Sequence, residues 1–264
     1  METRTIKIPV MADRFAAGEK PEYLFWVGCA GAFDDRYKKV TAAFAKILVY
    51  LDIDFAVLGK EESCTGDPAR RAGNEMLYQM QAIQNIEIFK AYEVKKIITI
   101  CPHCYNIFRN EYPDLGGEYE VINYLELIDQ NIKEGKLKID SKAFDGESIT
   151  YHDPCYLGRA NGIYDEPRTI LKELGNKVLE MDRNRSKALC CGAGGSQMFK
   201  EAEKGEKEIF IERTEDVLKT NAEIVATSCP FCMTMMTDGL KYKNREEDIK
   251  NYDIAEIIVE ALDL

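Results

Sequence analysis

The sequence predicts an α/β fold built as two tandem, pseudo-symmetric repeats, each a small parallel sheet flanked by helices. Two observations support this prediction. Short apolar segments, typical of buried strands, alternate along the chain with segments of helical periodicity. The cysteines of the second half also follow those of the first half at a nearly constant distance of 126 to 128 residues. Alternating strands and helices favour a parallel sheet with right-handed crossovers.

In the first repeat we expect strands at residues 23–27, 55–58 and 97–100. Two helices separate them, each with apolar residues at helical spacing. On the first helix these are Phe44, Ile47, Leu48 and Leu51, and on the second they are Leu77, Met80 and Ile83. The second repeat follows the same order, with strands expected at 148–152, 178–181 and 224–227. Its helices are expected at 166–174 and 203–219.

After the last predicted strand of each repeat comes an apolar-rich segment, VINYLELI near 121 and DIAEIIVEAL near 253, which we expect to be helical. The polar stretch KIDSKAFDGES, with its turn-forming Asp-Gly, separates the repeats. We therefore expect an N-terminal arm at 1–20 outside both repeats, a first domain at 21–147 and a second at 148–264.

Composition excludes several classes of function. The chain of 264 residues has a net charge of −11, which argues against nucleic-acid binding because phosphates require clustered Lys and Arg. No segment approaches the roughly 18 apolar residues of a membrane span. The N-terminus lacks the apolar core of a signal peptide. We expect a cytoplasmic protein without a direct membrane span, in which any membrane association is made through a partner.

The nine cysteines form two similar sets, each spread over the loops that follow predicted strands. The first set is Cys29, Cys64, Cys101 and Cys104, and the second is Cys155, Cys190, Cys191, Cys229 and Cys232. In a parallel sheet the loops after the strands emerge at one edge, where open α/β sheets bind ligands. Each set is therefore expected to converge at the carboxyl edge of its sheet.

Five convergent thiols in the second repeat leave several chemistries open. Zinc and a cubane [4Fe–4S] cluster each take four ligands and would leave one thiol over. A thioredoxin-like CxxC pair or a disulfide between Cys190 and Cys191 would use only two. An iron–sulfur assembly in which one sulfur bridges two irons would use all five.

At this point a resemblance becomes specific. Cys155, the triplet Cys190-Cys191-Gly192 and the final CPFC motif resemble the CCG cysteine-rich domain, which is found in heterodisulfide reductase and in the iron–sulfur components of glycolate oxidase and lactate-utilisation complexes. The resemblance covers residues 21–264, so that both repeats are identified as CCG repeats. It implies a noncubane [4Fe–4S] cluster on the five thiolates of repeat two, with Gly192 letting the backbone approach the cluster.

Repeat one departs from the pattern. Where CCG is expected the sequence reads Ser63-Cys64, which leaves four thiols and makes the motif degenerate. Four thiols suit a cubane [4Fe–4S] cluster, with less weight zinc, and they leave open a noncubane cluster with altered ligation or no metal. The stretch ESCTGDPARRAGNE is also similar to fused CCG proteins thought to pass electrons from electron-transfer flavoprotein toward quinone, which carry ferredoxin-type and membrane segments in the same chain.

We therefore expect an iron–sulfur electron-transfer subunit of a heterodisulfide reductase-like complex, linking a flavoprotein or hydroxy-acid dehydrogenase to a quinone or disulfide acceptor. The expected partners are a ferredoxin-type iron–sulfur subunit, a flavoprotein, or both, because the chain has neither a ferredoxin cysteine run nor a nucleotide fingerprint. The alternative is a zinc-stabilised, non-redox binding or scaffold protein. No residue is assigned a catalytic role. His103 and His152 lie beside cysteines, where a hydrogen bond to a ligand thiolate is commoner than ligation.

Overall fold

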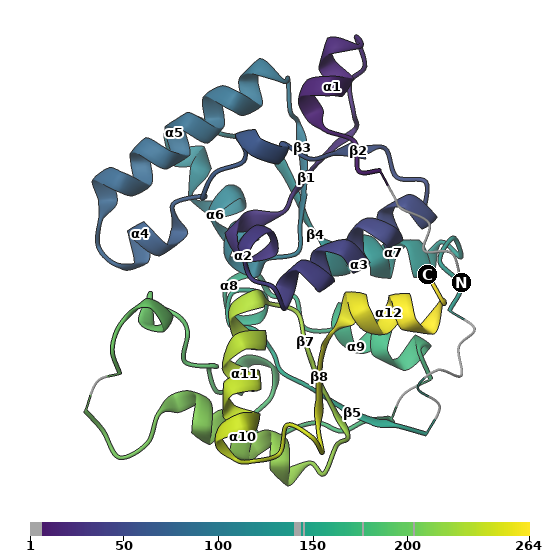
Figure 1. Cartoon of the computed structure of the whole chain (residues 1–264), viewed down its shortest axis with the longest axis vertical. Coiled ribbons are helices and arrows are strands. Elements are labelled where there is room, and N and C mark those ends of the chain that lie inside the picture. The colour runs from purple at the N-terminus through teal and green to yellow at the C-terminus, as the bar shows by residue number, and fades with distance from the viewer. Residues whose placement is uncertain (1–6, 140–143, 145, 176, 203) are drawn as a thin grey trace.

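The structure is a computed structural model that describes residues 7–139, 144, 146–175, 177–202 and 204–264. It contains two four-stranded sheets flanked by helices (Figure 1). Every pairing in both sheets is parallel, and the strand orders, β2-β1-β3-β4 and β6-β5-β7-β8, are equivalent. The prediction of two α/β repeats, each with a small parallel sheet, is confirmed.

The central strands of each sheet are the apolar runs that the sequence marks most clearly. The strands of the first sheet are β1 (Tyr23–Trp26), β2 (Phe55–Ala56), β3 (Lys96–Thr99) and β4 (Glu120–Asn123). Those of the second are β5 (Ser148–Tyr151), β6 (Lys177–Val178), β7 (Ile224–Thr227) and β8 (Lys250–Asp253). In β1 and β7 nearly every residue is buried, as expected for parallel strands covered on both faces. The edge strands β2 and β6 are shorter than predicted, with two residues each.

Each sheet has a fourth strand in a segment that the sequence analysis assigned to helix. The segment near 121 is strand β4 followed by α7 (Tyr124–Lys133), and the segment near 253 is β8 followed by α12 (Ile254–Ala261). A capping box separates strand from helix in both repeats. Asn123 accepts from the Leu125 N–H while Glu126 accepts from the Asn123 N–H, and Asp253 and Glu256 do the same in repeat two.

The helix predicted around Phe44 is α3 (Tyr37–Tyr50), and its apolar stripe is buried. The next predicted helix is α5 (Glu75–Ala91), but there the expected face was wrong. Met80 is 61% exposed and Ile83 is 50% exposed, while Ala82, Ile86 and Phe89 face the core. In repeat two, α9 (Glu166–Glu173) matches its prediction. The helix α10 (Ile209–Lys219) begins later than predicted, and residue 203 lies outside the described residues.

The sequence analysis did not foresee the helices that follow the CxxC strands, α6 (Pro102–Asn110) and α11 (Pro230–Tyr242). Shorter helices are α1 (Met11–Ala16), α2 (Gly28–Phe33), α4 (Asp67–Arg71) and α8 (Gly158–Asn161). Over its described part, the N-terminal segment contacts the first repeat. Val10 bridges Val57 beside β2, and Met11, which is 2% exposed, joins the core of the first repeat.

The two repeats interlock through the last helix of each. Helix α12 packs on α3 of the first repeat, and α7 packs on α9 of the second (Figure 1). At the junction the buried Asp253 accepts hydrogen bonds from Tyr124 at 2.8 Å and Tyr37 at 3.4 Å, and Arg36 forms a bidentate pair with Glu256. The predicted join at 138–148 falls partly on residues outside the described set.

Candidate metal centre

The cysteines lie at the carboxyl ends of the parallel strands, as the topology requires. Cys101 and Cys229 follow β3 and β7 closely and are the N-caps of α6 and α11. Proline occupies the first helical position in both, where its missing N–H costs nothing. The second cysteine of each CxxC motif therefore lies in the first helical turn, where the helix dipole favours a thiolate.

The four thiols of repeat one form a single group, which we call site one. The hydrogen bond with Cys64 raises the pKa of Cys29, and the same contact lowers the pKa of Cys64 to about 7. A hydrogen bond with Cys101, together with burial, raises the pKa of Cys104. All four cysteines line one small pocket with Phe231 of repeat two. The structure thus brings together every cysteine predicted for this site.

The five thiols of repeat two form a second group, site two. Cys155 and Cys190 are hydrogen-bonded, and this contact raises the pKa of Cys155 and lowers that of Cys190. Contacts continue from Cys190 to Cys191, from Cys191 to Cys232 at 3.4 Å between sulfurs, and from Cys232 to Cys229. All five cysteines therefore belong to one connected cluster of side chains.

The backbone around the cysteines shows which residues of site one and site two correspond, and it corrects the predicted position of the missing thiol in repeat one. Gly66 N–H donates to the Cys64 sulfur at 3.4 Å, and Gly192 N–H donates to the Cys190 sulfur at 3.3 Å. Both glycines have left-handed φ values, 88° and 95°. Cys64 also contacts Cys29 as Cys190 contacts Cys155. Cys64 thus corresponds to Cys190, not to Cys191 as the sequence analysis assumed.

Thr65 is consequently the residue that stands where repeat two has Cys191. Thr65 is 3% exposed, and its hydroxyl accepts from the Asp67 N–H at 3.4 Å. Ser63, which the sequence analysis placed at the missing thiol, points its hydroxyl at the Asn85 side chain at 2.8 Å. The signal was present in the sequence, because Cys29 precedes Cys64 by 35 positions, as Cys155 precedes Cys190.

The donor set of site two includes a buried nitrogen without a partner. A ring nitrogen of His152 lies within 4.8 Å of the sulfurs of Cys191 and Cys232. His152 Nδ1 accepts from Arg213 Nε at 3.0 Å, so Nε2 carries the proton, and Nε2 has no partner among the described residues. Burial, reinforced by the Arg213 charge, lowers the pKa of His152. A neutral N–H donor that is orphaned beside thiols fits a site for sulfur-rich anions.

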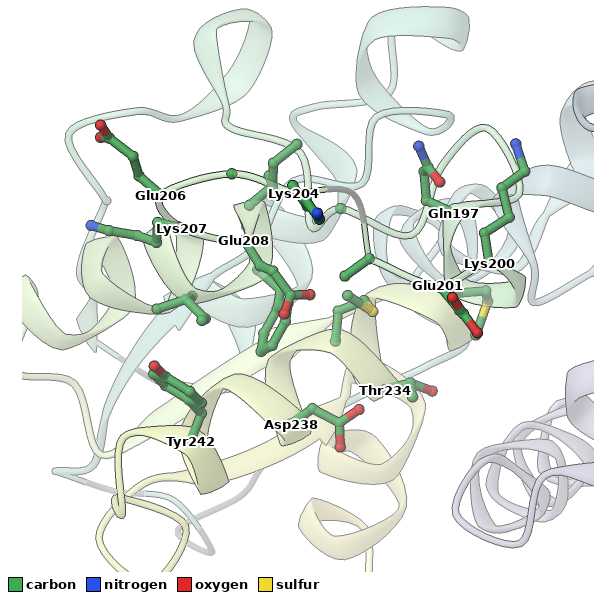
Figure 2. A pocket seen from close by; sticks show the side chains of 18 residues that line it. Gln197, Lys200, Glu201, Lys204, Glu206, Lys207, Glu208, Thr234, Asp238 and Tyr242 are labelled. Atoms are coloured by element: carbon green, nitrogen blue, oxygen red, sulfur yellow. The ribbon is translucent and has the colours of Figure 1, made fainter.

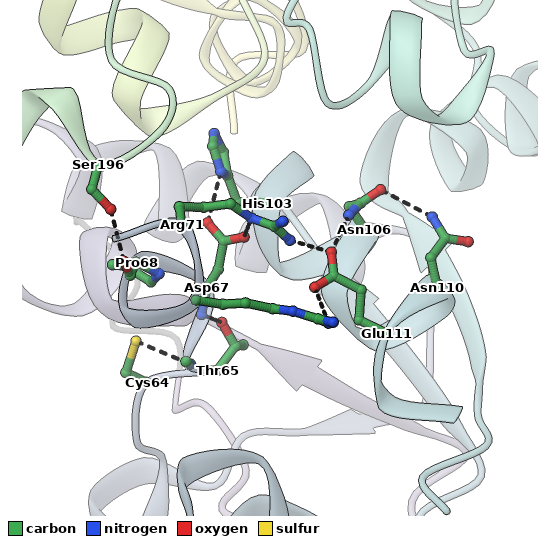
Figure 3. A network of polar contacts seen from close by, with 12 residues as sticks. Cys64, Thr65, Asp67, Pro68, Arg71, His103, Asn106, Asn110, Glu111 and Ser196 are labelled. Carbon is green, nitrogen blue, oxygen red and sulfur yellow. Dashed lines mark hydrogen bonds and ion pairs between the residues drawn. The ribbon is translucent and has the colours of Figure 1, made fainter. Parts of the chain in front are cut away.

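Several residues around the sites were missed by sequence reasoning. Asp67 receives hydrogen bonds from Arg71 and His103, and Arg71 also pairs with Glu111 (Figure 3). Burial opposes charge on His103, but hydrogen bonds with Asp67 and Cys229 outweigh it and raise its pKa. In repeat two Arg213 is fully buried. An arginine on a helix is normally solvated, so no pattern in the sequence marks it.

One sizeable cavity lies away from the thiols. It has a volume of about 760 Å³ and is lined by residues of the segments 197–202 and 204–208 and of the helices α10 and α11 (Figure 2). Of the Cys190-Cys191-Gly192 triplet only Gly192 lines this cavity, and none of the described cysteines does. Its walls mix Lys200, Lys204 and Lys207 with acidic side chains. The candidate metal centre is therefore defined by sulfur convergence and not by cavity size.

Comparison with known proteins agrees with this geometry. The profile of the CCG family, described as a cysteine-rich domain, matches residues 23–109 and 149–237. A probable iron–sulfur-binding oxidoreductase, FadF, of Bacillus subtilis is 44% identical over 99% of this chain and 37% of its own length. EtfAB:quinone oxidoreductase of Syntrophomonas wolfei is 47% identical over 93% of this chain and 35% of its own.

One polypeptide of the dihydromethanophenazine:CoB–CoM heterodisulfide reductase of Methanosarcina acetivorans is 33% identical over 93% of this chain and 60% of its own length. The chain thus spans about a third of the length of the Bacillus subtilis and Syntrophomonas wolfei relatives. Among solved structures, glutamate racemase from Aquifex pyrophilus covers 92% of this chain and 81% of its own at 16% identity, with a TM-score of only 0.35. No helix in the described part of the chain is long and apolar enough to cross a membrane. The chain belongs to the CCG cysteine-rich domain family and carries two copies of that domain.

Proposed function

We propose that this chain is the iron–sulfur electron-transfer part of an oxidoreductase that connects a flavoprotein to a quinone or a disulfide acceptor. One observation carries the proposal: nine thiols gather in two groups at the carboxyl edges of two interlocked sheets. Relatives that are 44% and 47% identical are named as an iron–sulfur oxidoreductase and a quinone oxidoreductase, which supports the same reading.

We infer different clusters at the two sites. Site two offers five thiols, one more than zinc or a cubane cluster takes, and suits the noncubane [4Fe–4S] cluster that the family resemblance implies. Site one offers four thiols, with Thr65 in the fifth position, and suits a cubane [4Fe–4S] cluster. A zinc-stabilised scaffold would leave the fifth thiol of site two, and its neighbouring N–H donor, without a role.

In this proposal each group near the sulfurs has a physical task. The thiolates would hold the iron, and a bound cluster would supply reversible one-electron transfer. The Gly66 and Gly192 N–H groups donate to ligand sulfurs, and His152 places a further donor beside Cys191 and Cys232. Such donors stabilise negative charge on sulfur and so raise the reduction potential.

The proposed partners follow from what the relatives are called and from charge. The name of the Syntrophomonas wolfei relative indicates an electron-transfer flavoprotein as donor and a quinone as acceptor, and we extend both to this chain. A ferredoxin-type iron–sulfur unit would carry electrons onward. The net charge of −11 would favour a basic docking face on a partner. We propose a cytoplasmic location with any membrane association made through that partner.

Anaerobic purification tests the proposal. We expect a brown protein with broad absorption near ~400 nm and about eight irons per chain, four for each [4Fe–4S] cluster. Reduced electron-transfer flavoprotein should then bleach this absorption in a stopped-flow experiment. A colourless protein with one zinc per repeat would refute the electron-transfer function and establish the scaffold alternative.

A further inference from the structure

An aromatic layer lies between the two thiol groups. The ring of His103, which sits inside the CPHC motif of site one, stacks on Tyr156 with centroids 4.2 Å apart and an interplanar angle of 30°. It meets Phe231 edge to face at 4.8 Å. Tyr156 directly follows Cys155, and Phe231 lies inside the CPFC motif of site two. His103 therefore packs against residues that adjoin the thiols of the other repeat.

Hydrogen bonds of the same ring connect the sites more directly. His103 Nδ1 lies 3.0 Å from Asp67 Oδ2, and the ring is also hydrogen-bonded to the Cys229 side chain. Asp67 stands at the end of the Cys64-Thr65-Gly66 turn, and its backbone N–H donates to Thr65 (Figure 3). A continuous chain of contacts thus runs from the turn that carries Cys64 to a predicted ligand of site two.

Further ion pairs and hydrogen bonds fix the position of the Asp67 carboxylate. Arg71 Nε donates to Asp67 Oδ1 at 2.9 Å, and Arg71 also contacts Glu111, which accepts from Asn106 at 2.9 Å. Asp67 is 3% exposed and His103 is 8% exposed, so water cannot readily replace either contact. The carboxylate accepts one ring N–H, and this leaves the other ring nitrogen for the sulfur.

The chemistry at Cys229 decides the direction of this hydrogen bond. A carboxylate and a metal-bound thiolate are both acceptors, so the ring must be the donor to each. An N–H donor to a ligand thiolate stabilises the more negative, reduced state of a cluster and raises its reduction potential. The donor to site two is supplied by repeat one.

We propose that His103 is a positioning residue that couples the two sites, holding Cys229 by a hydrogen bond from repeat one and thereby setting the reduction potential of the cluster in repeat two. This inference rests on the proposed function, because it requires clusters at both sites. It assigns to the interface between the repeats a role in electron transfer besides stability. Electrons that pass between the sites would do so across the His103 ring.

Redox potentiometry followed by EPR on the purified holoprotein tests the inference. His103→Phe keeps an aromatic ring against Tyr156 and removes both hydrogen bonds. We expect the midpoint potential of the site-two signal to fall beyond the spread among wild-type preparations, with iron content unchanged. His103→Gln, whose amide can still donate, should restore the potential at least in part. The matched control is Lys46→Met, which removes a different inter-repeat hydrogen bond, from Lys46 on α3 to the Leu264 carbonyl at 2.8 Å, outside the network of Asp67, Arg71 and Glu111.

The outcomes separate this inference from the proposed function. Clusters present in the wild type with an unchanged site-two potential in His103→Phe would overturn the inference and leave the function standing. Absence of iron from the wild type would overturn the function itself. If His103→Phe loses iron, Asp67→Asn decides the question: a lowered site-two potential supports the coupling, and an unchanged potential refutes it. An equal shift in Lys46→Met would also refute it, since any loosening of the interface would then have the same effect.

Discussion

Changing Thr65 to cysteine should convert the first site into the type of the second. The structure places Thr65 where repeat two has Cys191, directly after the cysteine whose sulfur accepts from the glycine N–H. Thr65→Cys would therefore complete a five-thiol set in repeat one. Ser63→Cys is the matched control, because it adds a thiol two positions away, beside Asn85.

The structure also predicts different stability costs for the two changes. The Thr65 hydroxyl accepts one long hydrogen bond, 3.4 Å from the Asp67 nitrogen, so losing it should cost less than about 1 kcal/mol. The Ser63 hydroxyl donates a 2.8 Å hydrogen bond to the Asn85 side-chain oxygen. The Asn85 amide nitrogen in turn donates to the Cys64 carbonyl and the Tyr112 hydroxyl. Removing this bond leaves a buried acceptor unpaired, at about 1 to 3 kcal/mol.

EPR and Mössbauer spectra of the three proteins provide the assay, with urea unfolding as the measure of stability. We expect Thr65→Cys to lose the cubane spectrum proposed for site one and gain a second component like that of site two, at unchanged iron content. Ser63→Cys should keep the wild-type spectrum and unfold at lower urea. A wild-type spectrum for Thr65→Cys, or a converted spectrum for Ser63→Cys, would refute the alignment of the two sites.

Three further changes test the fold and its link to the site. Burial raises the carboxyl pKa of Asp253 to about 7, above about 3.9 for an unfolded chain, so the folded state binds this proton more tightly. The protonated Asp253 carboxyl therefore stabilises the fold fully below about pH 4, and this stabilisation is lost as the pH rises through 7. Asp253→Asn should remove up to about 4 kcal/mol of the pH dependence of the unfolding free energy, measured in urea. An unaltered pH slope would contradict this. Gly66→Ala should destabilise the protein by about 1 to 3 kcal/mol more than Gly73→Ala. Both glycines have positive φ, but only a methyl group added at Gly66 would meet the Tyr78 side chain, at 2.9 Å. Equal melting temperatures of the two variants would count against this. Removing iron with a chelator should lower the melting temperature, since a ligand bound only by the folded state stabilises it, and a calorimetric scan before and after chelation would reveal the change.

Sequence reasoning found the parallel sheets because their central strands are short, buried apolar runs. It missed β4 and β8 because each is four residues long, is partly polar and runs directly into a helix. The Asn-x-x-Glu and Asp-x-x-Glu capping boxes mark those boundaries and could have divided strand from helix. On α5 both faces carry large apolar residues, so periodicity could not decide which face is buried.

At the site, spacing and topology together predicted that each set of cysteines converges. The position of the missing thiol was misassigned because Ser63 and Thr65 flank the same cysteine. The 35-residue spacing from Cys29 to Cys64 already favoured Thr65, and the backbone contacts of Cys64 agree. The sequence analysis expected a hydrogen bond between His103 and a ligand thiolate, but it did not foresee that the thiol is Cys229 of the other repeat. That contact depends on how the repeats pack against each other, which is fixed by helices such as α12 on α3 and not by any local motif.

The all-parallel pairing of both sheets has a consequence for how the protein acquires its metal. Among the described residues no strand of either sheet pairs with its neighbour through a hairpin. Strand β1 pairs with β3, which follows several intervening helices, and this pairing must form before Cys29 and Cys101 can approach each other. Pairing of segments so distant in sequence is a slow step in folding. Until it is complete the full sets of four and five thiols are not assembled, and the thiols are open to oxidation. If the proposed clusters are present, their complete ligand sets form only as the sheets close, and the yield of iron-loaded protein should depend on a reducing environment that persists until then.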